Sequence, residues 1–256
     1  MSMLLAAAAL AAALNRPAPR ASLRLSRAPL VVIDPGHGGK DSGARHDGVR
    51  EDQVNLAMAY TLGAILRADG YRVVLTRGLA CEPVWLRRGL DPKASQALAG
   101  GRPLSSCRMN LRDRVLYAAQ KRESVFLSLH CDHYADPAVH GPRTYYGEGS
   151  ELQKSLAEAV QRELDAFRTR PFAPAAAKHF VLVSQPRVPA VTIELGFLTN
   201  PRERALLETE SYRRDLARAI ARGLDAYRRE HRLVPAPKVD ERAVAALWRR
   251  ARARHK

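Results

Sequence analysis

The sequence contains few cysteines and few aromatic residues, and it lacks a long hydrophobic run. Only three cysteines and an aromatic content of 6% are found among its 256 residues. No apolar stretch reaches the roughly 18 residues that a membrane-spanning helix requires, so we expect no transmembrane span. The sequence also lacks zinc-finger spacing and aromatic RNA-binding motifs, which argues against a module for specific nucleic-acid binding.

Acidic residues are scarce relative to basic ones, and this imbalance indicates anionic partners. The chain carries 42 Lys and Arg residues against 26 Asp and Glu, a formal net charge of +16. Such a surface is attracted to nucleic acids, anionic lipids and anionic cell-wall polymers alike. Because no nucleic-acid module is present, we expect contact with anionic envelope surfaces. Residues 231–256 form a basic C-terminal tail, which either docks on such a surface or is simply solvated.

Residues 1–28 form a candidate signal or export segment with a linker. An Ala- and Leu-rich stretch from Met3 to Leu14 precedes a polar, proline-containing stretch, as in the apolar region of a signal peptide. No basic residue precedes the stretch, so a loosely ordered tail is the alternative. Export predicts a periplasmic or secreted protein, in which Cys81 and Cys107 can form a disulfide. In a cytosolic protein they would be reduced thiols.

Hydrophobic periodicity predicts one α/β domain over residues 29–230. Strands are predicted at 30–34, 71–75, 125–130, 180–183 and 191–194, and helices at 51–69, 111–121, from about 150 and from about 211. This alternation favours a mainly parallel, twisted sheet flanked by helices on both faces. Residues 78–110 are rich in glycine and proline without any period, which predicts a long insertion able to act as a lid.

Three predicted strands lead into residues that can bind a metal or move protons. His37 follows the first strand in VVIDPGHGG, His130 closes VFLSL, and Glu194 closes VTI. Ligands of open α/β sheets bind at the carboxyl ends of the strands, so we expect these residues in one pocket. Catalytic zinc usually takes three protein ligands and leaves one position for water. Glu51, which opens a helix after the Gly-rich loop, is the better third ligand, and Glu194 is then free as general base.

Each of these residues, taken singly, also has an ordinary structural explanation. A histidine after a strand is often only hydrogen-bonded, and Glu51 is favoured at a helix N-terminus by the macrodipole. Glu194 can pair with a nearby arginine. The candidate ligands are also far apart in sequence, unlike the compact HExxH motif, so spacing alone does not assign a metal.

Seven segments, in order, resemble the zinc-dependent N-acetylmuramoyl-L-alanine amidase family. They are VVIDPGHGGKDSGA, EDQVNLA, YRVVLTR, LRDRVLYA, FLSLHCD, RTYYG and PAVTIELGFLTN, over roughly residues 29–228. The resemblance implies that His37, Glu51 and His130 bind one Zn²⁺ and that Glu194 is the catalytic glutamate. It also implies hydrolysis of the amide between N-acetylmuramic acid and the L-alanine of the peptidoglycan stem peptide, in cell-wall remodelling or daughter-cell separation. The family fold is a mainly parallel, twisted sheet between helices.

The sequence departs from the family pattern at two places. The 78–110 insertion is longer than the usual connection, and Cys131 stands where the family typically has a small residue such as alanine. Because strand neighbours point to opposite faces, Cys131 is expected to be a small buried side chain and not a fourth ligand. Asp34, Arg77 and Arg114 match family positions; Asp34 is expected to organise the Gly-rich loop.

The resemblance also bears on partners and alternatives. Peptidoglycan is the implied substrate, and some family members are held inactive by a helix over the zinc until a partner protein releases it. An activator protein is therefore a candidate partner. Two other functions remain open: a non-catalytic peptidoglycan-binding module that keeps the fold, and a zinc peptidase that cuts within the stem peptide.

Overall fold

The structure, a computed structural model, describes residues 29–78, 124–177 and 189–231. Several predicted features lie outside these ranges: the export segment, nearly all of the 78–110 insertion with Cys81 and Cys107, the helix at 111–121 with Arg114, the strand at 180–183 and the basic tail. None of the helices within the described ranges is both long enough and apolar enough to cross a membrane.

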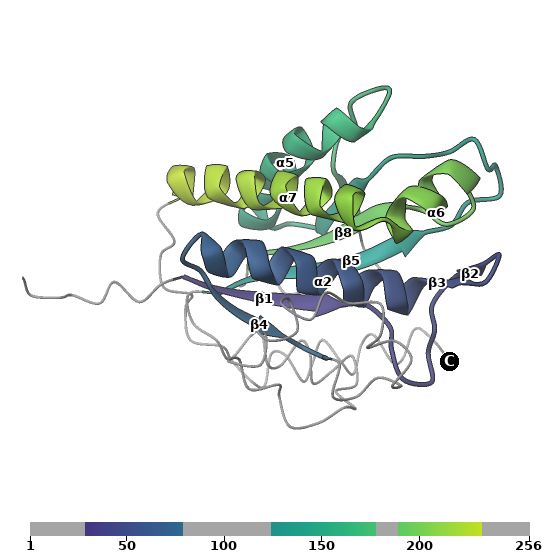
Figure 1. Ribbon diagram of the computed structural model, residues 1–256. Coiled ribbons are helices and arrows are strands. Elements are labelled where there is room, and N and C mark those ends of the chain that lie inside the picture. Colours follow the sequence, from purple (N-terminus) through teal and green to yellow (C-terminus); the bar gives the residue numbers. More distant parts are fainter. Residues whose placement is uncertain (1–28, 79–123, 178–188, 232–256) are drawn as a thin grey trace, which may run out of the picture.

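A six-stranded sheet forms the centre of the molecule (Figure 1). Its strands are β1 (Leu30–Pro35), β4 (Arg72–Leu75), β5 (Ser124–Asp132), β6 (Arg143–Gly147), β7 (Ala175–Ala177) and β8 (Ala190–Phe197), in the order β4-β1-β5-β8-β6-β7. The first four in this order are parallel, whereas β6 runs antiparallel to β8. Two short strands, β2 (Arg45–His46) and β3 (Val49–Arg50), form a separate hairpin. The predicted mainly parallel α/β fold is confirmed.

The described helices include three long ones, which pack together on one face of this sheet (Figure 1). They are α2 (Glu51–Ala68), α5 (Glu151–Leu164) and α7 (Glu210–His231), and all three confirm predicted helices. The Ser150 hydroxyl caps α5 by accepting a hydrogen bond from the Gln153 N–H. A short 3₁₀ turn, η3 (Asp165–Phe167), follows α5, and the unpredicted helix α6 (Pro201–Glu208) precedes α7.

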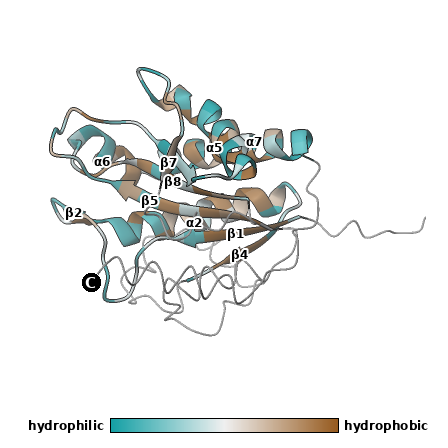
Figure 2. Ribbon diagram, turned by 180° about the vertical axis from the view of Figure 1, so that it is seen from behind, coloured by the Kyte–Doolittle hydropathy of each residue, from teal (hydrophilic) through white to brown (hydrophobic). Residues whose placement is uncertain are grey.

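The three central strands β1, β5 and β8 bury both of their faces, which explains their largely apolar sequences. Val31, Ile33 and their counterparts on β5 and β8 belong to the core shared with the helices. Val32 and Phe126 are buried on the opposite face, and β1 and β5 are drawn largely in brown in Figure 2. By the same alternation His130 and Glu194 lie on the face that points away from α2, α5 and α7.

Candidate metal centre

The loop after β1 is shaped so that His37 turns into the site. His37 has a left-handed backbone with φ of 60°, which is uncommon outside glycine. The Arg77 side chain anchors the start of this loop by two hydrogen bonds. Its Nε donates to the Pro35 carbonyl at 2.9 Å, and its Nη2 donates to the Gly36 carbonyl at 3.0 Å. It also donates to the Asp52 carbonyl at 2.6 Å, so one guanidinium ties the loop to the first turn of α2.

Glu51, the first residue of α2, supplies the carboxylate at the centre of the group. Its Oε1 lies 3.1 Å from His37 Nε2 and 3.0 Å from His130 Nδ1. Backbone N–H groups of Cys131 and Ala44 donate to its two oxygens at 3.1 and 2.8 Å. Burial opposes ionisation, but the hydrogen bonds from His130 and His37 prevail and hold the pKa of Glu51 well below its usual range.

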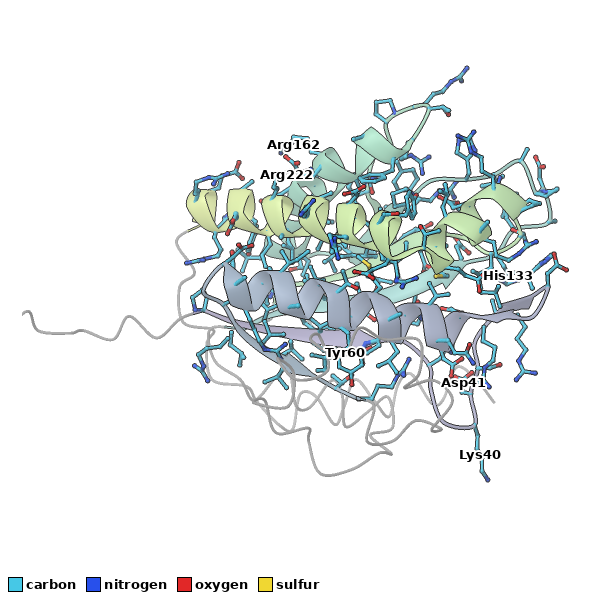
Figure 3. All side chains as sticks on the ribbon, in the orientation of Figure 1. Lys40, Asp41, Tyr60, His133, Arg162 and Arg222 are labelled. Carbon is cyan, nitrogen blue, oxygen red and sulfur yellow. The ribbon has the colours of Figure 1, made fainter. Side chains whose placement is uncertain are left out.

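The orientation of the His37 ring is fixed by a hydrogen bond at Nδ1, the nitrogen that does not face Glu51. His37 Nδ1 lies 2.8 Å from Asp41 Oδ2, which leaves Nε2 facing Glu51. The hydrogen bond to Glu51 raises the pKa of His37 from 6.5 to about 9; burial opposes the shift and Asp41 reinforces it. Metal-binding histidines commonly donate their second nitrogen to a carboxylate in this way. Asp41 and His133 mark this end of the molecule in Figure 3.

The three donor atoms form a group that fits a tetrahedral metal. His37, Glu51 and His130 each offer one ligand atom, and these atoms lie within 4.8 Å of one another. Bonds of roughly 2.0–2.2 Å to a tetrahedral zinc place ligand atoms about 3.3–3.5 Å apart. The nitrogen–oxygen separations of 3.1 and 3.0 Å are close to that value. Two imidazole nitrogens and one carboxylate oxygen are also a donor set that catalytic zinc uses.

Glu194 lies one strand away from this group. It is the register partner of His130 on β8, so both side chains leave the same face of the sheet. The carboxylate is 5% exposed, and its Oε2 has no hydrogen-bond partner among the described residues. Burial, and then the nearby carboxylates of Asp132 and Glu51, raise the pKa of Glu194 well above its ordinary value. The alternative of a structural salt bridge is not observed: no described basic nitrogen lies within 4 Å of this carboxylate.

Other candidates have different positions. Cys131 is buried on the helix-facing side, where its Sγ lies 3.5 Å from Asn55 Oδ1, as expected from strand alternation. Asp34 of β1 accepts hydrogen bonds from Ser128 of β5 and from Thr76, the residue after β4. It therefore links these three neighbouring strands. His140 lines a separate pocket of about 430 Å³ beside α6.

Sequence reasoning missed the roles of Arg77 and Asp41. The role of Asp41 could have been predicted, because a carboxylate four residues after a candidate histidine ligand can hydrogen-bond to the imidazole ring of that histidine. The role of Arg77 could not, because its acceptor carbonyls at Pro35 and Gly36 lie more than 40 residues away in the chain.

Comparison with known proteins is consistent across sequence and structure. The family described as N-acetylmuramoyl-L-alanine amidase matches residues 31–226. The amidase LytC of Bacillus subtilis is 30% identical over 204 residues, which cover 78% of this chain and 35% of LytC. The amidase AmiC of Neisseria meningitidis is 27% identical over 250 residues, covering 80% of this chain and 54% of AmiC. The chain therefore spans about a third to a half of the length of these relatives.

A solved structure shows the same architecture. The CwlD amidase from Clostridioides difficile, determined in complex with the GerS lipoprotein, superimposes with a TM-score of 0.64 at 25% identity. The match covers 78% of this chain and 98% of CwlD, which is consistent with one complete domain of this type.

Proposed function

This chain belongs to the N-acetylmuramoyl-L-alanine amidase family, and on that basis we propose that it is a zinc-dependent hydrolase of peptidoglycan. The bond cut is the amide between N-acetylmuramic acid and the L-alanine of the stem peptide. The observation that carries the proposal is the group of two imidazoles and one carboxylate at ligand distances, with the buried Glu194 one strand away, whose Oε2 has no hydrogen-bond partner among the described residues.

His37, Glu51 and His130 are the residues that would hold zinc. His37 would present Nε2, because Asp41 holds its Nδ1, whereas His130 would present Nδ1, the atom that faces Glu51. The backbone donors at Ala44 and Cys131 orient the Glu51 carboxylate. When bound, zinc acts as a Lewis acid that makes water acidic near neutral pH and polarises a carbonyl group.

Glu194 is assigned the proton transfers. Within the described part of the chain its Oε2 has no partner to displace, so it can accept a proton from the attacking water and then deliver it to the leaving nitrogen of L-alanine. The raised pKa of Glu194 means that its carboxylate binds a proton more tightly than an ordinary glutamate does, which suits a group that accepts a proton and passes it on.

The substrate places the proposed activity outside the cytoplasm, in the periplasm or as a secreted protein, with residues 1–28 as the export segment. The described residues contain 19 Lys and Arg against 20 Asp and Glu, so the excess charge of +16 resides in the other parts of the chain. We assign contact with anionic envelope surfaces to those parts. The CwlD complex with a lipoprotein supports a protein partner for this chain as well, and the family resemblance makes an activator the candidate.

The test is digestion of purified peptidoglycan with identification of the products by mass. Stem peptides that begin at L-alanine are expected, and a chelator should abolish them. Glu194→Gln should lower the rate by about 10²- to 10⁴-fold while the zinc content stays unchanged. Glu158→Gln, an exposed position on α5, is the matched control and should retain activity.

Two outcomes would contradict the proposal. Absence of products despite bound zinc would favour a binding module. Products cut within the stem peptide would favour a zinc peptidase.

A further inference from the structure

One arginine beside the metal centre has no acidic partner among the residues that the structure describes. Arg143, the first residue of β6, is the register partner of Glu194, which in turn pairs with His130. The three residues therefore form a row across β5, β8 and β6. Thr144 bonds to Ala157 and Gln161 of α5, so the neighbouring Arg143 side chain leaves the opposite face, the face of Glu194.

Two aromatic rings hold the guanidinium of Arg143 in place. Its central carbon lies 4.8 Å from the ring centre of Phe197 and 5.2 Å from that of Phe172. Its side chain hydrogen-bonds to Tyr145, while the buried Nε has no hydrogen-bond partner. Aromatic faces orient a planar guanidinium without neutralising its charge.

Two other partly buried or buried arginines of the described chain, Arg50 and Arg204, do have carboxylate partners. Arg50 pairs with Asp52, and Arg204 pairs with Asp47. By contrast, no carboxylate in the described ranges lies within 4 Å of the Arg143 guanidinium, and this includes its register partner Glu194. An oriented, unneutralised cation at the edge of a reaction centre is the arrangement expected of an anion-binding group.

We propose that Arg143 binds a carboxylate of the stem peptide, on the peptide side of the bond to be cut, and thereby selects acidic over amidated substrates. This inference rests on the proposed function. The guanidinium fork matches a carboxylate, which it can bind through two parallel hydrogen bonds. On the sugar side, the lactyl carboxyl group is itself consumed in the amide, so the free carboxylates of the substrate lie in the peptide.

The distances suit the second residue of the stem peptide. Neighbouring strands lie about 4.8 Å apart, so β6 is roughly 10 Å from β5, which carries His130. An extended peptide advances about 3.4 Å per residue, and two residues bring its chain about 7 Å from the scissile amide. The Arg143 side chain spans the rest of the distance between the peptide and β6. Arg143 is thus a specificity residue and takes no part in the bond cleavage itself.

The test compares two soluble muramoyl peptides that differ only at the second residue, where the carboxylate is either free or converted to an amide. The wild-type zinc enzyme should prefer the free carboxylate by about 10-fold or more in kcat/KM, because hydrogen bonds to charged groups are stronger than those to neutral ones. The preference should appear mainly in KM. Arg143→Gln should cleave both peptides equally well, and Arg143→Lys should retain part of the preference, because it keeps the charge but loses the fork.

Arg162→Gln is the matched control. Arg162 is an exposed residue of α5 on the helical side of the molecule (Figure 3), and its substitution removes the same charge without changing the preference. Phe172→Leu is a second variant, which should weaken the preference by loosening the guanidinium while leaving zinc content unchanged.

The outcomes separate this inference from the proposed function. Equal cleavage of both peptides by the wild-type enzyme, or an unchanged preference in Arg143→Gln, would overturn the role of Arg143 alone. Failure of the zinc-loaded wild-type enzyme to cleave either peptide or whole peptidoglycan would overturn the proposed function, and this inference with it.

Discussion

The imidazole of His130 lies directly against the backbone of Gly36. A Cβ atom on Gly36 would be 2.2 Å from His130 Cε1 and 2.3 Å from Nε2, closer than any real contact. Gly36 is not among the residues with positive φ, so the space taken by the histidine ring, and not a turn, requires glycine there.

Gly36→Ala is therefore expected to push His130 out of the metal-binding group. We expect zinc affinity to fall by about 10- to 100-fold, comparable to the loss of an orienting contact, while the chain remains folded. Zinc titration together with circular dichroism measures both quantities. Gly39→Ala is the control: its φ of 67° imposes about 1–2 kcal/mol of backbone strain, but nothing lies within 4 Å of the added carbon. Equal zinc affinity in the two variants would contradict the prediction.

Asp41 orients His37, and its substitution should weaken metal binding. Asp41→Asn removes the charged acceptor 2.8 Å from His37 Nδ1. Because Asp41 is largely exposed, we expect a loss at the lower end of the usual range, about 10-fold in zinc affinity. Competition with a chelator of known affinity gives the value. Asp69→Asn, at the other end of α2, is the control and should bind zinc like the wild type.

Zinc binding should depend on pH through His37. Its pKa of about 9 means that the metal-free protein carries a proton on His37 at neutral pH, and zinc must displace it. Apparent affinity should therefore rise about tenfold per pH unit between pH 7 and 8, with about one proton released per zinc. Calorimetry in buffers of different ionisation enthalpy measures this release. An affinity independent of pH in that interval would refute the assignment.

The same raised pKa should make the metal-free protein less stable as the pH rises, whereas zinc affinity should increase. The contribution of protonated His37 is complete below its unfolded value of 6.5 and is lost as pH rises through about 9. His37→Gln should remove this part of the pH dependence from thermal unfolding curves.

Arg77 is expected to matter for stability as well as for the site. Arg77→Lys keeps the charge but replaces the fork by a single ammonium group, which cannot serve the Pro35, Gly36 and Asp52 carbonyls together. We expect the free energy of unfolding to fall by about 2–3 kcal/mol in denaturant titrations. Arg72→Lys, exposed on β4, should change it by less than about 0.5 kcal/mol.

Much of the fold could be predicted because its central elements are strongly patterned. The apolar runs of β1, β5 and β8 and the helical spacing of α2, α5 and α7 follow directly from burial. The short element β7 consists of three alanines, and β6 is a five-residue strand with a mixed sequence, so neither carries a detectable period. Helix α6 did have a signal: Asn200 caps it, Pro201 opens it, and the Glu203 N–H donates to the Asn200 side chain.

The site, like the fold, has a part that could be predicted from the sequence and a part that could not. His37, Glu51 and His130 were predicted because each stands at the boundary of a recognisable element, and the structure brings them together. The local contact of Asp41 with His37 could have been predicted from its spacing, but the contacts of Arg77 could not, because they depend on distances across the fold. Arg143 illustrates this limit, since its position beside Glu194 follows only from the antiparallel register of β6.

The direction of β6 has a consequence for how such a domain can diversify. His37, His130 and Glu194 are delivered at or beyond the ends of β1 and β5 and near the end of β8, and Glu51 at the start of α2, whereas Arg143 is delivered where β6 begins, after the 133–142 connection. A change in the length or composition of that connection would move the start of β6 without touching the segments that hold the metal. The proposed selectivity and the proposed catalysis are therefore encoded in separate stretches of chain, and one can evolve while the other stays constant.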